Sequence, residues 1–204
     1  MKEEIWLKER KTVLTGTDIP VLYGCGFQTQ LQLWQYKRGL SPEIKPNIDM
    51  EAGRLLEPLI LNELKRLVGK DVELHPDKRW RKREDIRLGA TLDGMTPDLE
   101  IHEIKTTGRP FGKGLPERVV LQVHTQRIVF NEAKAAWAWE YQLRKDEKAE
   151  VIFAAYKGWE LPFYPERLKY HEVKKNQRKE DEIKAVATTW WVRHMLMGEP
   201  PEDK

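Results

Sequence analysis

The sequence predicts an α/β fold in which a central mixed β-sheet is flanked by helices. Residues 99–105 alternate polar and apolar side chains between turn signals, which is the pattern of a β-strand. Residues 47–68 and 116–130 repeat apolar side chains at helical spacing instead. The composition, with 40% hydrophobic and 34% charged residues, is typical of a soluble globular protein.

Length and composition bound the kind of protein. A chain of 204 residues can bury a full core, and we expect one domain spanning residues 1–204. The net charge of +3 is mild, so a nucleic-acid site must come from local clustering. No apolar run approaches the length of a membrane span, and no signal-peptide core is present, so no membrane is expected. The single Cys25 excludes an intramolecular disulfide and a four-cysteine cluster, and fits a reducing cytoplasm.

The first forty residues contain two predicted helix starts. Thr15 or Thr17 can cap a short helix that begins at Asp18, and Thr29 opens a second helix. Arg10 and the two threonine hydroxyls fall together at the first of these starts, where such a cluster can hold a phosphate. A capping threonine beside a solvated arginine explains the same residues equally well.

A long helix is predicted over residues 47–68. Its apolar residues recur at helical spacing, and Gly69 ends it. Pro58 lies inside the pattern, so we expect the helix to begin or bend there. Glu57 lies next to the apolar stripe, and periodicity alone favours a solvated carboxylate over one that points into a polar site.

The densest positive charge follows a short predicted strand at Val72–Leu74. Five basic residues of the run 78–83 surround Trp80, which suits a segment that tracks phosphates and stacks on a base. A solvated surface explains the run about equally well, but its position just before Asp93 favours DNA binding. The DNA-binding candidates are Arg79, Arg81 and Arg83.

A predicted hairpin brings two acids together. Asp93 follows a short apolar strand that starts at Leu88, and the turn residues after it lead the chain back along strand 99–105. On that strand Glu103 and Lys105 share one face, and Ile104 takes the other. Two carboxylates and an ammonium would then occupy one small space. Oxygen ligands of this kind suit Mg²⁺ or Mn²⁺, although an ordinary surface ion pair has the same sequence.

The rest of the chain completes the fold. In the helix 116–130, Gln122 and Gln126 lie on one face, and His124 is an isolated polar residue. We expect further strands at Ala133–Tyr141, Val151–Tyr156 and Leu168–Val173, and an amphipathic helix from Asn176 to Gly198.

Five short motifs occur in register along the chain. They are Arg10 with VLTGTD, GRLLEP around Glu57, LDG at Asp93, EIK at 103–105, and LQVHTQ with Gln122. This order resembles the lambda exonuclease or YqaJ-type viral recombinase group of the PD-(D/E)xK nuclease superfamily. Leu92 stands where the superfamily usually has proline, which is no metal ligand. The resemblance implies a restriction-endonuclease-like core.

The resemblance also implies the metal site. Asp93, Glu103 and the carbonyl of Ile104 would hold a first Mg²⁺. Glu57, with Asp93, would help to place a second, and Mn²⁺ is a possible substitute.

The same resemblance assigns the remaining site residues. Lys105, assisted by Gln122, would position and activate the attacking water. Arg10 and Thr17 match the positions that engage a terminal 5′-phosphate.

A Mg²⁺-dependent 5′→3′ exonuclease acting on ends of double-stranded DNA in phage-type recombination is therefore the expected function. Residues 1–45 would bind the DNA end, 46–175 would form the catalytic core, and 176–198 would form a C-terminal helix. Expected partners are a single-strand-annealing protein and further copies of the chain, with a ring trimer as one form. The alternatives are a structure-specific or sequence-specific endonuclease of the same superfamily, or a DNA-binding module without catalysis.

Overall fold

The structure is a computed structural model, and it describes residues 3–43, 45–69 and 80–202. Within these residues, none of the helices combines the length and apolar character that crossing a bilayer requires. The helices are α1 (Glu3–Lys11), α2 (Ile19–Leu22), α3 (Gln30–Lys37), α4 (Ile48–Val68), α5 (Glu117–Val129), α6 (Glu147–Lys157) and α7 (Gln177–Trp190). The strands are β1 (Leu14–Thr15), β2 (Trp80–Arg83), β3 (Leu88–Thr91), β4 (Gly94–Met95), β5 (Glu100–Thr107), β6 (Ala135–Gln142) and β7 (Leu168–Glu172).

The described strands form two mixed sheets. The larger has the order β4-β5-β6-β7, in which β5 and β6 are parallel and both outer strands are antiparallel to their neighbours. The smaller has the order β1-β3-β2, with β1 parallel and β2 antiparallel to β3. Mixed sheets flanked by helices confirm the predicted α/β class, although the strands are divided between two sheets.

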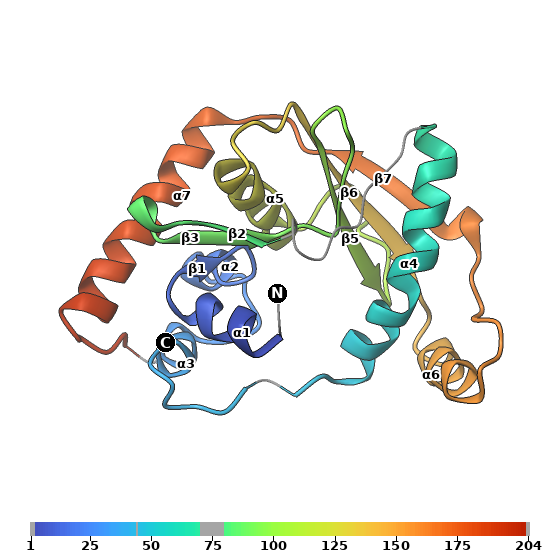
Figure 1. The fold of residues 1–204 in the computed structure, drawn as a ribbon, viewed down its shortest axis with the longest axis horizontal. Coiled ribbons are helices and arrows are strands. Elements are labelled where there is room, and N and C mark those ends of the chain that lie inside the picture. The colour runs from blue at the N-terminus through green and yellow to red at the C-terminus, as the bar shows by residue number, and fades with distance from the viewer. Residues whose placement is uncertain (1–2, 44, 70–79, 203–204) are drawn as a thin grey trace.

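Two apolar cores hold the layers together. One joins β3, α2, α5 and α7, and the other joins α4 and α6 to one face of the larger sheet. In Figure 1, α7 runs along one side of the molecule and α4 along the other, with α5 between them. Strand β5 serves both cores, because Ile101 packs in the first and Ile104 in the second.

Helix α4 passes through Pro58 without starting there. It begins at Ile48, where the Asn47 side chain accepts hydrogen bonds from two backbone N–H groups, and ends at Gly69 with φ 65°. Of the two predicted alternatives, a helix that begins or one that bends at Pro58, the first was therefore wrong. Its buried leucines and Ile60 anchor the helix on both sides of the proline, which offsets the lost backbone hydrogen bond.

The predicted strand at Val151–Tyr156 is instead part of helix α6. Val151 and Ala154 are buried at helical spacing, whereas Phe153 and Tyr156 are exposed. Helix α6 ends at Gly158, which has a φ of 68°. The β-branched and aromatic residues of this segment favoured a strand, but tertiary packing against α4 selects the helix.

Other elements match the sequence more closely. Strands β6 and β7 and helix α5 lie where they were expected, and α7 continues into a π-helical turn at Trp191–Leu196. Helix α1 was not foreseen. The predicted strand Val72–Leu74 lies outside the described residues.

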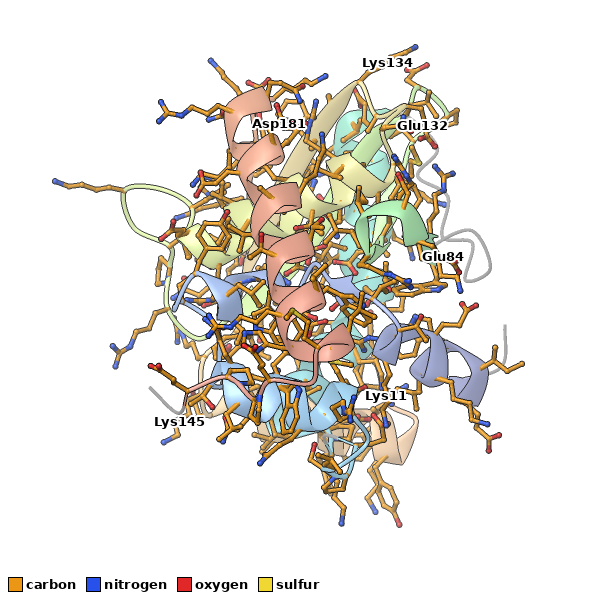
Figure 2. The ribbon with its side chains drawn as sticks, turned by 90° about the vertical axis from the view of Figure 1, so that its left-hand side faces the viewer. Lys11, Glu84, Glu132, Lys134, Lys145 and Asp181 are labelled. Atoms are coloured by element: carbon orange, nitrogen blue, oxygen red, sulfur yellow. The ribbon has the colours of Figure 1, made fainter. Side chains whose placement is uncertain are left out.

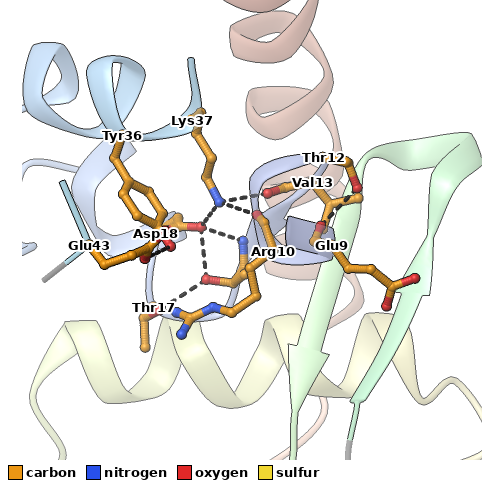
Figure 3. Close-up of polar contacts among 10 residues, drawn as sticks. Glu9, Arg10, Thr12, Val13, Thr17, Asp18, Tyr36, Lys37 and Glu43 are labelled. Atoms are coloured by element: carbon orange, nitrogen blue, oxygen red, sulfur yellow. Dashed lines mark hydrogen bonds and ion pairs between the residues drawn. The ribbon is translucent and has the colours of Figure 1, made fainter. Parts of the chain in front are cut away.

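A buried ion pair fastens the N-terminal helices to each other. Lys37 Nζ lies 2.6 Å from Asp18 Oδ2 and also donates to the carbonyls of Arg10 and Val13 (Figure 3). Both charged side chains are almost fully buried. Burial alone would raise the pKa of Asp18, but Lys37 and the Thr15 backbone N–H outweigh burial and lower it. Asp18 therefore stays ionised and structurally paired.

Neutralising this pair should destabilise the fold. We expect Asp18→Asn to lower the free energy of unfolding by about 3–5 kcal/mol at pH 7, because it leaves the Lys37 ammonium buried without a counter-charge. Urea denaturation measures the loss, and Asp146→Asn on the exposed surface is the matched control. An unpaired buried lysine has a lowered pKa, so the unfolded state binds more protons and the deficit should shrink towards about pH 9. A deficit that stays constant with pH would contradict this explanation.

Candidate active site

The hairpin between β4 and β5 brings Asp93 beside Glu103. Gly94 is opposite His102 and Met95 is opposite Ile101 in an antiparallel register. Asp93 Oδ2 accepts a hydrogen bond of 2.8 Å from the backbone N–H of Ile104. The predicted hairpin is thus confirmed, and the Asp93 carboxylate is fixed by the strand that carries Glu103.

Glu103 is buried, and three side chains contact its carboxylate. Gln122 Nε2 donates to its Oε1 at 2.6 Å, and Gln126 Nε2 donates to its Oε2 and to the carbonyl of Thr91. Lys105 Nζ lies 2.5 Å from Oε1, as expected for residues on one face of β5. Helix α5 therefore orients the carboxylate that β5 presents. Gln126 was recognised as lying on the face of Gln122, but its bond to Glu103 was not predicted.

The two carboxylates lie where negative charge is in excess. Burial raises the pKa of Asp93 well above its ordinary value, and the Glu103 and Glu57 carboxylates raise it further, while Lys105 opposes them. Burial would lower the pKa of Lys105, but Glu103 and Asp93 outweigh burial and raise it. Lys105 is therefore a cation that balances part of the charge.

The donor set fits a hard divalent cation. A positive ion between Asp93 and Glu103 would offset both the burial and the repulsion that raise the pKa of Asp93. Carboxylate oxygens are also the ligands that Mg²⁺ and Mn²⁺ prefer. In the described part of the chain, no three His, Cys, Asp or Glu side chains form a ready-made metal cluster. Backbone oxygen, water or substrate would have to supply the remaining ligands.

A pocket of about 550 Å³ opens over these groups. Asp93, Glu103, Ile104 and Lys105 line it from one side. Glu57 lines it from α4 and is half-buried. The solvated position that periodicity favoured for Glu57 was therefore wrong, because α4 directs this side chain towards the acids.

Arg10 and Thr17 line the same pocket from the N-terminal segment. Arg10 Nη2 donates to Thr17 Oγ1 at 3.4 Å, and its guanidinium stacks 4.6 Å from the Trp6 ring centroid. Thr17 in turn shares a 2.9 Å hydrogen bond with Thr15. The fold thus gathers the two groups that were predicted separately from distant parts of the sequence.

Comparison with known proteins identifies the family. The family model of the YqaJ-like viral recombinase domain matches residues 5–133, which include every predicted site residue. The chain belongs to the YqaJ-like viral recombinase family. No curated protein matches it significantly.

Solved structures support the fold of this recombinase-family chain. LHK-Exo in complex with dAMP has a TM-score of 0.68 at 16% identity, covering 95% of this chain and 93% of that one. LHK-Exo, an alkaline exonuclease from Laribacter hongkongensis, has a TM-score of 0.66 at 17% identity and the same coverage. A phage-related exonuclease from Haemophilus somnus 129PT has a TM-score of 0.58 at 11% identity, with 83% and 82% covered. At these identities the likeness establishes the restriction-endonuclease-like fold.

The basic run of the recombinase-family chain lies elsewhere. Arg81 pairs with Glu132 at 2.6 Å and Arg83 with Asp85 at 2.7 Å, and neither arginine lines the pocket of Asp93. Arg79 lies outside the described residues. A role of this run in DNA binding stays a prediction.

Phe27 and Arg118 line the pocket but were not predicted from the sequence. Phe27 is 94% exposed and lines the pocket, and Arg118 lies 5.3 Å from its ring centroid. Arg118 precedes Gln122 by one helical turn, so helical spacing could have placed it on the same face. The position of Phe27 depends on the path of a loop and had no sequence signal.

The carboxylate pair can be tested without an activity assay. We expect Mg²⁺ to raise the melting temperature of the parent protein. At a hundredfold excess over Kd, binding adds about 2.7 kcal/mol to the free energy of unfolding. Asp93→Asn should lose this stabilisation and be more stable than the parent without metal, because it removes a charge from a repulsive cluster. Thermal unfolding with Mg²⁺ and with EDTA makes the measurement, and the exposed Glu150→Gln is the control. An undiminished Mg²⁺ response in Asp93→Asn would reject the site.

Proposed function

We propose that this protein is a metal-dependent exonuclease that degrades linear double-stranded DNA in the 5′→3′ direction during phage-type recombination. The observation that carries the proposal is the shared pocket, in which an acid–lysine cluster and the Arg10–Thr17 pair face one space. The first can cleave a phosphodiester and the second can recognise the end produced. Membership of the recombinase family and the exonuclease fold support the same reading.

Asp93, Glu103 and the Ile104 carbonyl would hold Mg²⁺, with Glu57 contributing to a second position and Mn²⁺ as a possible substitute. The bound metal would lower the pKa of water and stabilise negative charge on the scissile phosphate. Gln122 and Gln126 keep the Glu103 carboxylate in one orientation, so a ligand atom would be in place before DNA arrives.

Lys105 would act on the attacking water as a cation. Its ion pair with Glu103 keeps the ammonium charged, so Nζ can orient a water oxygen by donating to it. The same charge would stabilise the phosphate oxygens as negative charge develops on them. A neutral Lys105 would lose its ion pair with Glu103. We therefore favour a role in which the charged ammonium positions the water over one in which a neutral amine accepts its proton.

Arg10 and Thr17 would bind the terminal 5′-phosphate. A terminal phosphate carries more charge and more free oxygens than a diester, and a guanidinium can meet two of these oxygens at once. Arg10 is already oriented by Trp6 and Thr17, which reduces the entropy lost on binding. Each cut that leaves a 5′-phosphate would regenerate the ligand of this pair.

The proposed partners are duplex DNA ends, a single-strand-annealing protein and further copies of the chain, with a ring trimer as one arrangement. Recombination beside an annealing protein needs the single strand that such degradation exposes. A structure-specific or sequence-specific endonuclease is the second candidate, since the acid–lysine cluster alone does not require an end.

Arg10 should confer a preference for phosphorylated ends. We expect linear duplex with 5′-phosphate ends to be degraded faster than the same duplex with 5′-hydroxyl ends. Arg10→Ala should lower the ratio of these two rates by roughly tenfold or more, because a charge-assisted bidentate contact with the 5′-phosphate is lost. Gel assays of end-labelled duplex make the measurement, and Arg144→Ala outside the pocket is the matched control.

Three outcomes of this assay are informative. Survival of closed circular duplex would support the exonuclease. Equal rates on both end types in the parent and in Arg10→Ala would reject the end pocket. Rapid cutting of closed circles would favour the endonuclease instead.

Replacement of Lys105 should separate chemistry from metal binding. Lys105→Ala should lower kcat by about 10²-fold or more, as loss of a group acting on the nucleophile does. Mg²⁺-induced thermal stabilisation should largely remain, because both carboxylates are intact. Single-turnover cleavage and thermal unfolding give the two readouts, with Lys145→Ala as the control. A loss of only a few-fold would return Lys105 to a plain surface ion pair.

A further inference from the structure

A second pocket, of about 240 Å³, lies where α7 begins. It is formed by the end of β2, the last turn of α5 and the first turns of α7, and shares no lining residue with the first pocket. In Figure 2 the helix α7 faces the viewer, and its first turns lie near the labelled Asp181. The cationic lining residues are Arg83, Arg127, Lys175 and Lys184.

The charges of this pocket do not cancel. Arg83 and Lys184 are paired with acids that do not line the pocket, since Asp85 and Asp181 lie 2.7 Å and 2.9 Å from them. The remaining two cations, Arg127 and Lys175, face one lining carboxylate, that of Glu180. A surplus of positive charge therefore remains inside the pocket.

Glu180 is also engaged on its other side. Its Oε1 lies 3.3 Å from His124 Nδ1 and 3.4 Å from Arg127 Nε. Burial would raise the pKa of Glu180, but His124, Arg127 and Lys175 outweigh burial and lower it. The carboxylate is thus ionised at neutral pH and is hydrogen-bonded to His124, which leaves Arg127 with only a longer ionic contact.

Arg127 is the side chain with an open hydrogen-bonding position. It is only 7% exposed, and its Nε has no hydrogen-bond acceptor among the described residues, because Glu180 approaches outside hydrogen-bonding geometry. A buried guanidinium donor without an acceptor costs free energy that an incoming oxyanion can recover.

The start of α7 supplies a second, independent attraction for an anion. The helix has 14 residues, and its capping Asn176 side chain accepts from the Lys179 N–H. No described residue accepts a hydrogen bond from the backbone N–H of Gln177 or Arg178, and Gln177 lines the pocket. The positive end of the helix dipole favours negative charge at this point.

We propose that this pocket binds a phosphate group, carried either by free phosphate or by the DNA backbone. The volume accommodates a phosphate and a few waters but no base pair, which would make it a contact for a single group. Arg127 would meet two phosphate oxygens with its guanidinium, Lys175 would balance the charge, and the α7 N–H groups would complete the set. Only the DNA form of this binding rests on the proposed function.

Inorganic phosphate tests the site directly. The metal-free full-length protein carrying Arg10→Ala is titrated with phosphate at constant ionic strength, so that the first pocket contributes little. We expect the ¹H–¹⁵N resonances of Gln177 and Arg178 to shift, with a Kd on the order of 1 mM. Lys175→Gln should weaken this binding roughly fivefold or more, because one charge-assisted contact is lost. Lys145→Gln, labelled far from the start of α7 in Figure 2, is the matched control and should change nothing.

A second arm identifies the source of the phosphate. The same resonances are followed in EDTA with a hairpin-capped duplex that has no free end. If they shift, and Lys175→Gln reduces the salt slope of duplex binding by about one unit, the site contacts the DNA backbone. If they shift with phosphate alone, the site takes free phosphate. No shift with phosphate, or an equal shift in Lys175→Gln, overturns the proposal. Failure of the end-preference assay would leave these results unaffected, because Arg10 and the metal carboxylates lie in the other pocket.

Discussion

The alternation of strand β5 is the constraint on which the rest of the site depends. Ile104 packs in the core beneath α4, so its neighbours Glu103 and Lys105 must face the opposite side. The backbone N–H of the same Ile104 holds Asp93. One apolar residue therefore sets the positions of both carboxylates and of the ammonium. A shift of the strand by one residue would bury Lys105 among apolar side chains and separate the site residues. The geometry of the site is therefore linked to the packing of the second core.

Two aspartates, the buried Asp18 and the half-buried Asp93, show how environment separates a structural role from a chemical one. Asp18 has a lysine, a threonine hydroxyl and a backbone N–H as partners, and its pKa is lowered. Asp93 accepts from one backbone N–H, and burial and two neighbouring carboxylates raise its pKa against the opposing charge of Lys105. The first is a satisfied ion pair that fastens the N-terminal helices. The second is left with charge that a cation can neutralise. A carboxylate whose pKa is raised by burial and like charges is therefore a better indication of a functional site than one whose pKa is lowered by an ion pair.

Local pattern predicted those parts of the molecule that depend on neighbours in sequence. The period of β5, the turns after Asp93 and the glycine at the end of α4 all follow from short-range rules. The predicted strand Val151–Tyr156 failed because its β-branched and aromatic composition suits a strand, while burial follows a helical period set by α4. The bond from Gln126 to Glu103 and the pairing of Arg81 with Glu132 join residues far apart in the chain. Such contacts depend on how elements pack, and a single sequence contains no direct signal for them.

Helix α5 explains how one element can serve two pockets. Gln122 and Gln126 lie one turn apart and reach Glu103, whereas Arg127, the next residue along, is rotated by about 100° and reaches Glu180 on α7. The helix is almost entirely buried over its last two turns, so neither set of side chains can move without disturbing the packing of both sheets. A rigid helix of this kind keeps Glu103 oriented without relying on the substrate. It also holds Arg127 in place while its nearest carboxylate is shared with His124, and this fixed, incompletely satisfied guanidinium is what makes the start of α7 receptive to an anion.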